Sequence, residues 1–130
     1  MAHNMQNVLT ENAPAPAGHY TQAMRSGNTL YISGQLPIRA DKTALEDLGF
    51  AAQARQAIAN MLAILEAGGG KPAHLCRVTA YIVGVENWPL FNQIYAEMLG
   101  DARPARTVVP VPELHYGFLV EIDAIAQIQD

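Results

Sequence analysis

The stretch FLVEIDAIAQI, residues 118–128, alternates two kinds of side chain in the way typical of a β-strand that is buried on one face only. One set of alternate positions is wholly apolar: Phe118, Val120, Ile122, Ala124, Ala126 and Ile128. The other set mixes apolar and polar residues: Leu119, Glu121, Asp123, Ile125 and Gln127. We therefore predict a sheet that packs helices against one face and leaves a mixed second face.

Two segments are predicted to supply those helices. From Leu48 to Gly68, apolar residues keep the spacing of three to four that marks one helical face, and Gly68-Gly69-Gly70 is suited to end the helix. Residues 87–100, NWPLFNQIYAEMLG, give a second helix, because Pro89 fits a first turn and Gly100 fits the position after the last turn.

The remaining strands are predicted at residues 20–25, 29–34, 75–84 and 107–114. The first two are joined at Ser26-Gly27-Asn28, a sequence that tolerates the positive φ of a tight hairpin turn. Two strands, a helix, a strand, a helix and two strands then describe an α+β layer pair, which we expect to fill residues 1–130 as a single domain. Residues 1–17, rich in Pro and Ala toward their end, are expected to form an extended N-terminal arm with few partners.

Composition narrows the classes of function. The chain has 130 residues and a formal net charge of -4, so its long-range field repels nucleic acid. No apolar run approaches the ~20 residues of a membrane span, and the first residues lack the pattern of a signal peptide, so we expect a cytoplasmic protein without membrane partners. The single cysteine, Cys76, cannot form an intrachain disulfide, and no Cys and His residues show the spacing of zinc ligands.

The mixed face of the sheet is expected to meet other subunits. Leu119 and Ile125 stand beside carboxylates there, an awkward surface for a monomer. A mixed face also suits a ligand cleft, so a site is expected where subunits join.

Arg106, within RPARTVVPV (103–111), is the leading candidate for a binding residue. A guanidinium binds a carboxylate through two parallel hydrogen bonds and stays charged at any working pH. Glu121, on the mixed face, could orient or deprotonate a water molecule. Arg106 and Glu121 would share one cleft if their strands pair, which the sequence does not fix. The plain alternatives are a surface salt bridge for Arg106 and a solvated strand carboxylate for Glu121.

Other candidates carry weaker signals. Ser33 and Gly34 end a strand, where a hydroxyl and an open backbone N–H can face a ligand, but no nucleophile motif surrounds the serine. Tyr20 opens the hairpin and either packs over a small substrate or covers the core. Asn92 lies off the apolar stripe of the second helix, where solvation is the simpler reading.

The histidines carry no catalytic pattern. His19 and His115 flank predicted strand ends and are favoured as ordinary surface residues, since no triad surrounds them. His74 and Cys76 begin one strand, and we favour packing over metal binding for this pair.

In several segments the chain resembles the RidA/YjgF family of reactive intermediate deaminases. The segments, in the family's order, are APAPAGHYTQA, GNTLYISGQLP, NMLAILEAGGG, FNQIYAEMLG, RPARTVV and LVEIDAIA. The resemblance implies a chorismate-mutase-like α+β subunit, assembled as a homotrimer with active sites at the subunit boundaries. It also implies hydrolysis of short 2-imino acids or their enamine tautomers, such as 2-iminobutanoate and 2-iminopropanoate, to 2-oxo acids and ammonia, without a cofactor.

The resemblance further implies residue roles. Arg106 looks like the arginine that binds the substrate carboxylate, and Glu121 like the glutamate that places the attacking water. Tyr20, Ser33, Gly34 and Asn92 look like residues lining the pocket.

Three positions depart from the family pattern. Val108 stands where cysteine is common, and if that position acts through its backbone, valine can replace it. His19 precedes Tyr20 where proline is frequent, and Leu114-His115 replaces a usual Leu-Pro. These changes bear on substrate preference more than on the chemistry.

Three alternative functions stay open. One is a non-catalytic trimer that binds a small 2-oxo acid through the same arginine. Another is deamination of a larger catabolic enamine, with the pocket reshaped by Val108, His115 and Tyr116. RNA cleavage is disfavoured by the acidic composition and the scarcity of basic residues.

Overall fold

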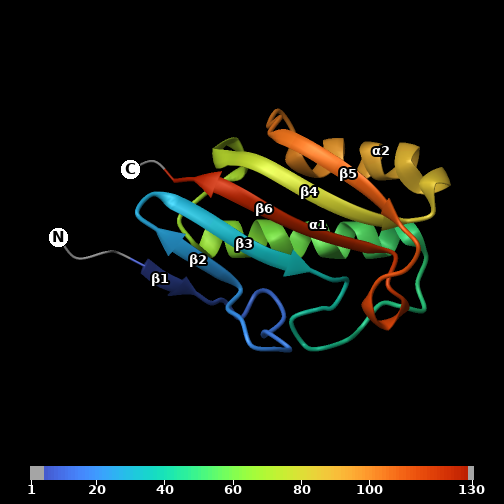
Figure 1. Ribbon diagram of the computed structural model, residues 1–130, viewed down its shortest axis with the longest axis horizontal. Coiled ribbons are helices and arrows are strands. Elements are labelled where there is room, and N and C mark those ends of the chain that lie inside the picture. Colours follow the sequence, from blue (N-terminus) through green and yellow to red (C-terminus); the bar gives the residue numbers. More distant parts are fainter. Residues whose placement is uncertain (1–4, 129–130) are drawn as a thin grey trace.

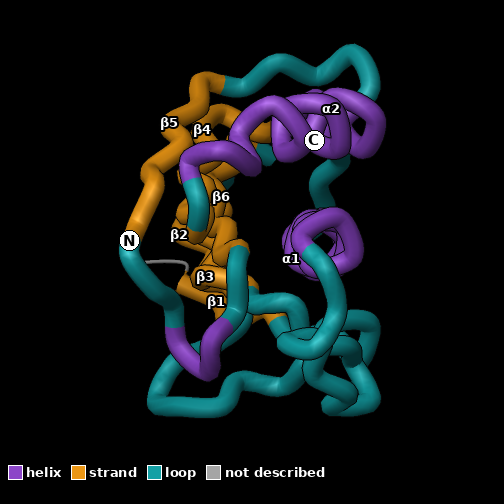
Figure 2. Tube along the Cα trace, turned by 90° about the vertical axis from the view of Figure 1, so that its right-hand side faces the viewer, coloured by secondary structure: helices purple, strands orange, loops and turns teal. Residues whose placement is uncertain are grey.

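The computed structural model describes residues 5–128, and within them six strands form one sheet with two α-helices against a single face (Figures 1 and 2). The strands are β1 Met5–Val8, β2 Ala23–Ser26, β3 Thr29–Gln35, β4 Leu75–Val83, β5 Ala105–Val111 and β6 Val120–Gln127; the helices are α1 Phe50–Ala67 and α2 Trp88–Leu99. Among these described strands, in the order β1-β2-β3-β6-β4-β5, only β4 and β5 run parallel. The predicted α+β fold, with a mainly antiparallel mixed sheet and two helices on one face, is confirmed.

Strand β6 lies inside the sheet, between β3 and β4. Every side chain of its predicted apolar set, from Phe118 to Ile128, is at most 3% exposed, which confirms the face assignment. Burying a side chain such as Ile122 contributes about 1.5–3 kcal/mol. Its other face is not covered by helices, and Leu119, Glu121, Asp123 and Ile125 are only partly buried there.

The predicted hairpin is formed by β2 and β3. Ser26 pairs with Thr29, so Gly27 and Asn28 make the turn, and Gly27 has a φ of +59° that a side chain would disfavour. The first strand begins at Ala23 instead of Tyr20, because residues 20–22 belong to the preceding loop.

The predicted N-terminal arm is wrong in part, because Met5–Val8 pairs with β2 as an edge strand. The first three of these residues are exposed, so they lack the apolar alternation that marks a strand in sequence. Residues 9–17 contain no strand, as expected, and residues 1–4 of the arm lie outside the described residues.

Both helices match their predicted positions. The buried stripe of α1 faces the sheet, and the helix ends at Gly68, followed by Gly69 at a φ of +94°. Helix α2 carries Pro89 in its first turn and ends at Gly100, also as predicted. Among the described residues, no helix is both long enough and apolar enough to cross a membrane.

Strand β4 breaks the alternation of buried and exposed side chains at one end. The pairing of β4 with β6 shifts register between Leu75 and Arg77, so Leu75 is buried and Cys76 is exposed, the reverse of simple alternation. The strand predicted at 107–114 begins earlier, at Ala105, and ends at Val111.

Candidate functional site

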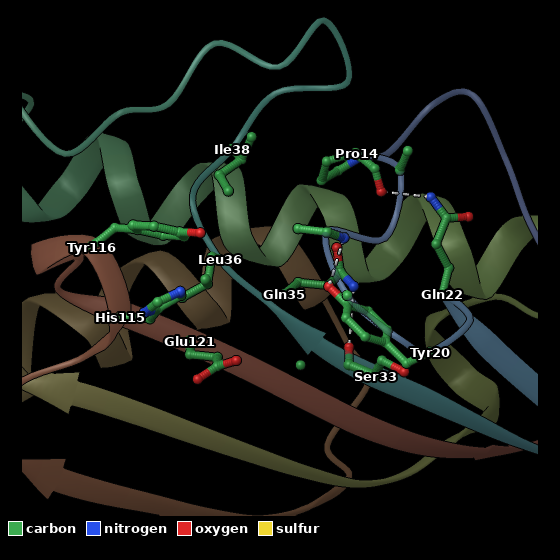
Figure 3. A pocket seen from close by; sticks show the side chains of 14 residues that line it. Pro14, Tyr20, Gln22, Ser33, Gln35, Leu36, Ile38, His115, Tyr116 and Glu121 are labelled. Atoms are coloured by element: carbon green, nitrogen blue, oxygen red, sulfur yellow. Dashed lines mark hydrogen bonds between the residues drawn. The ribbon is translucent and has the colours of Figure 1, made fainter.

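A cavity of about 390 Å³ opens at the end of β3 and brings together four of the predicted site residues (Figure 3). These are Tyr20, Ser33, Gly34 and Glu121. The rest of the wall comes from the loop before β2, from the chain just after β3, and from His115 and Tyr116. In Figure 3, Glu121 rises from β6 between His115 on one side and Ser33 on the other.

An irregularity in β3 brings the strand backbone close to Glu121. Ile32 pairs with Ala124 and Gln35 with Ile122, so Ser33 and Gly34 fall in a bulge. A Cβ atom on Gly34 would lie 2.6 Å from Oε2 of Glu121. The missing side chain of Gly34 therefore makes the space that the carboxylate occupies.

The environment of Glu121 makes it a weaker acid than an exposed glutamate. Burial raises the pKa of Glu121, the nearby Asp123 carboxylate raises it further, and His115 acts in the opposite direction. Burial likewise raises the pKa of Asp123, and Arg77 opposes that effect. A carboxylate of raised pKa accepts a proton from water more readily, which suits a general base that must later return it.

Ser33 and Tyr20 contribute oxygen atoms to the wall. The hydroxyl of Ser33 donates to the carbonyl of Thr21 at 2.7 Å, which commits its proton and leaves the oxygen free to accept. The hydroxyl of Tyr20 accepts a hydrogen bond from the Ala17 N–H at 3.3 Å, and half of this residue is exposed. Both therefore suit contact with a ligand better than nucleophilic attack.

Gln22 was not a candidate from the sequence, yet its hydrogen bonds fix the loop that forms one wall of the cavity. It is 1% exposed, and its amide nitrogen donates to the carbonyls of Thr10, Ala13 and Pro14 while its oxygen accepts from the Thr10 N–H. The Pro-rich loop is thereby fixed to the sheet (Figure 3). No motif marks such a residue, because a buried amide is recognisable only from its partners.

His115 and Tyr116 line the cavity although the sequence favoured an ordinary surface histidine. Both are exposed, and their ring centroids lie 3.6 Å apart. Tyr116 has a φ of +61°, a conformation uncommon for a residue with a side chain. His19 lies apart from this cavity, in a shallower groove with Asn7 and Met24.

The other predicted residues lie outside the cavity. Arg106 pairs in β5 with the buried Val78, and its Cζ atom lies over the rings of Tyr95 and Phe91 on α2, at 5.0 Å and 5.9 Å from their centroids. Val108 is 8% exposed and faces the same side, and Asn92 is exposed on α2.

Arg106 and Glu121 do not share a cleft within one chain. Strand β4 separates β5 from β6, Glu121 is level with Tyr81, and Arg106 is level with Val78. Arg106 and Glu121 are therefore two strands apart, at about 5 Å per strand, and three residues apart along the strands, at about 3.3 Å per residue. They also lie on opposite faces of the sheet. The hypothesis that their strands pair is wrong.

Among residues 5–128, no three His, Cys, Asp or Glu side chains gather in a way that could hold a metal ion. His74 Nδ1 accepts a hydrogen bond from the Lys71 N–H at 3.0 Å, which gives it a structural role at the start of β4.

Comparison with known proteins links this geometry to one family. A family model described as endoribonuclease L-PSP matches residues 10–128. A RutC family protein of Pyrococcus horikoshii is 40% identical over 119 residues, which cover 92% of this chain and 94% of the relative. The 2-iminobutanoate/2-iminopropanoate deaminase of Escherichia coli is 36% identical over 124 residues, covering 93% of this chain and 96% of the enzyme.

Solved structures agree with these sequence relatives. RidA from the Antarctic bacterium Psychrobacter superposes with a TM-score of 0.90 at 37% identity, covering 95% of this chain and 99% of that one. Escherichia coli TdcF, crystallised with bound serine, gives a TM-score of 0.90 at 26% identity with the same coverage.

Proposed function

Because the chain belongs to the endoribonuclease L-PSP family, also known as the RidA/YjgF family, we propose that it hydrolyses short 2-imino acids to 2-oxo acids and ammonia. Relatives that share 34–36% identity with this chain are named 2-iminobutanoate/2-iminopropanoate deaminase, which supports an imine deaminase. The expected substrates are 2-iminobutanoate and 2-iminopropanoate or their enamine tautomers, and the proposed reaction uses no cofactor.

The observation that carries this proposal is the division of the candidate residues into two complementary halves. The cavity presents the Glu121 carboxylate, whereas Arg106 stands at the edge of the sheet, and its side chain forms no hydrogen bond or ion pair among the described residues. A 2-imino acid needs both groups, a cation for its carboxylate and a base for the attacking water. We therefore propose that Arg106 of a second copy completes the cavity.

The uncovered face of the sheet supports assembly. Tyr31 is 49% exposed there, and Ile125, its pairing neighbour on β6, is only partly buried. A closed ring of three copies would bury this face and create three equivalent boundaries. Each boundary would join the Glu121 cavity of one copy to Arg106 of the next. The proposed working form is this homotrimer, with one active site at each boundary.

In the proposed mechanism, Arg106 binds the substrate carboxylate and fixes the position of the imine carbon. Glu121 takes a proton from water as the water oxygen bonds to that carbon, and the C=N double bond becomes a C–N single bond. The imine nitrogen enters protonated, so the adduct carries one hydroxyl and one NH2 group. The protonated Glu121 gives its proton to this NH2 group, the C–N bond breaks and ammonia leaves, and Glu121 accepts the hydroxyl proton as the carbonyl of the 2-oxo acid forms. The Ser33 oxygen, the Gly34 backbone and Tyr20 are assigned to shaping the cavity of one copy. Val108 and Asn92 are assigned to shaping the part that the copy supplying Arg106 contributes.

The first test is turnover by native protein and by Arg106→Ala. A threonine dehydratase generates 2-iminobutanoate in situ, and the appearance of 2-oxobutanoate is followed above the rate of free hydrolysis. We expect clear acceleration by the native protein and at least a 100-fold loss of that acceleration in the variant, because an unanchored substrate loses its orientation toward water.

Arg103→Ala is the matched control, because Arg103 is exposed in the loop before β5 and its replacement removes the same positive charge. It should retain native activity. Equal rates for native protein and Arg106→Ala would contradict the assignment of Arg106, and no acceleration by folded native protein would contradict the deaminase.

One second candidate is favoured by a specific observation, the serine held by a structural relative. A protein that only binds a small acid would use the same residues, and it would show saturable binding of 2-oxobutanoate without turnover. Deamination of a larger enamine would instead show activity only with bulkier substrates, and would make His115 and Tyr116 the residues to vary. RNA cleavage, which the family description names, would require salt-dependent RNA binding by a chain of net charge -4.

A further inference from the structure

Arg106 rests on a platform of two aromatic rings. Phe91 and Tyr95 are one turn apart on α2, their ring centroids are 5.6 Å apart, and the Cζ atom of Arg106 lies over both. A guanidinium within about 6 Å of an aromatic centroid is attracted to the face of the ring. The platform therefore holds the flat side of Arg106.

This mode of support differs from that of other arginines in the chain. Arg25 donates to the carbonyl of Gly68, Arg55 to Glu97 and Arg77 to the hydroxyl of Thr107. Among the described residues, the guanidinium of Arg106 donates to no acceptor. Ring contacts use the face of the guanidinium, so the N–H groups along its edge remain available for a carboxylate.

Tyr95 is suited to this role through its ring. The residue is 8% exposed, and its hydroxyl finds no hydrogen-bond partner among the described residues. Burial raises the pKa of Tyr95, while the charge of Arg106 acts in the opposite direction, so the phenol stays neutral. A buried hydroxyl without a partner adds nothing to stability, whereas the ring of Tyr95 contacts the guanidinium of Arg106 and fixes its position.

We propose that Tyr95, together with Phe91, is a positioning residue that presents the N–H edge of Arg106 to the carboxylate of the substrate. This inference rests on the proposed function, because it assumes that Arg106 binds that carboxylate. It adds that the aromatic face of α2 sets substrate affinity without touching the substrate.

Three variants separate positioning from packing. Tyr95→Phe keeps the ring and removes the unpartnered hydroxyl, so KM and kcat should stay within about twofold of native values. Tyr95→Leu removes the ring, so KM for 2-iminobutanoate should rise about tenfold with kcat within about twofold, since the lost contact acts on carboxylate binding. Leu99→Ala is the control, a buried position near the end of the same helix that perturbs packing away from Arg106.

A second measurement does not depend on turnover or on the folding of Tyr95→Leu. The Nε–Hε NMR signal of native Arg106, identified by its loss in Arg106→Lys, should show an upfield ring-current shift relative to Arg103. On titration with 2-oxobutanoate, native protein and Tyr95→Phe should saturate alike.

Two results would overturn the proposal. One is an equal rise in KM for Tyr95→Leu and Leu99→Ala, which would mean that the ring only fills the core. The other is an Arg106 signal that matches Arg103 in the native protein. If the native protein binds 2-oxobutanoate at Arg106 but hydrolyses no imine, the proposed function fails while the positioning role stands.

Discussion

Glu121 is more useful to the proposed reaction than to the stability of the fold. Its carboxylate is partly buried beside Asp123, without a salt bridge among the described residues, and it fits only because position 34 is glycine. A group whose pKa is raised by folding binds more protons in the native state than in the unfolded state. Its contribution to stability is therefore greatest below the ordinary glutamate pKa and is lost as pH rises through the raised value.

Glu121→Gln should accordingly stabilise the protein at neutral pH while it abolishes the chemistry. We expect a higher Tm than native at pH 7, a difference that shrinks toward pH 4, and a loss of activity of about 100-fold or more. Thermal unfolding followed by circular dichroism across this range, with turnover at pH 7, measures both.

The exposed Glu113→Gln controls for the loss of one negative charge and should leave Tm and activity near native values. A Tm difference between Glu121→Gln and native protein that grows toward low pH would contradict the assigned direction of the pKa.

The sequence predicted four residues that line the cavity, but not the residue that fixes the loop beside them. Tyr20, Ser33, Gly34 and Glu121 do line one cavity, and the bulge explains why a glycine is required there. Gln22 could not have been found in this way, because its role comes from carbonyls in a loop that only the folded chain brings to it.

At the scale of elements, the sequence predicts the bounds of strongly periodic segments well, but not those of short or irregular segments. The long helix predicted at 48–68 forms as Phe50–Ala67, and the alternation of β6 matches its buried face. Strand β1 was missed because it is short and exposed at the sheet edge, and the shift at Leu75 depends on pairing with β6. That β5 pairs with β4 and not with β6 could not be predicted either, because tertiary packing sets the order of strands in a sheet.

The loop that forms one wall of the cavity should depend on Gln22. Gln22→Met keeps the length of the side chain but removes hydrogen bonds to three carbonyls and one N–H, so unfolding free energy should fall by about 2–4 kcal/mol. Urea unfolding measures the change.

Gln56→Met is the matched control, because Gln56 is partly exposed on α1 and donates one hydrogen bond, to Asn60. Equal urea midpoints for the two variants would show that the amide of Gln22 does not secure the loop.

At the scale of the whole molecule, the sheet carries the two halves of the proposed site on opposite faces. The cavity with Glu121 opens at one end of β3, and Arg106 stands on the edge strand against α2. The alternation in residues 118–128 already predicted an uncovered face that meets other subunits. It did not predict that the arginine would lie on the helix side, because that depends on the parallel pairing of β4 with β5.

The most direct test of the central claim is to mix two inactive proteins, Arg106→Ala and Glu121→Gln, after dissociation and joint refolding. If each site takes Glu121 from one copy and Arg106 from the next, about one in four sites of a random mixture pairs two intact residues and regains imine hydrolysis. Recovery of about a quarter of native activity is the predicted result. A mixture of refolded, assembled protein that stays as inactive as its components would contradict a site shared between copies.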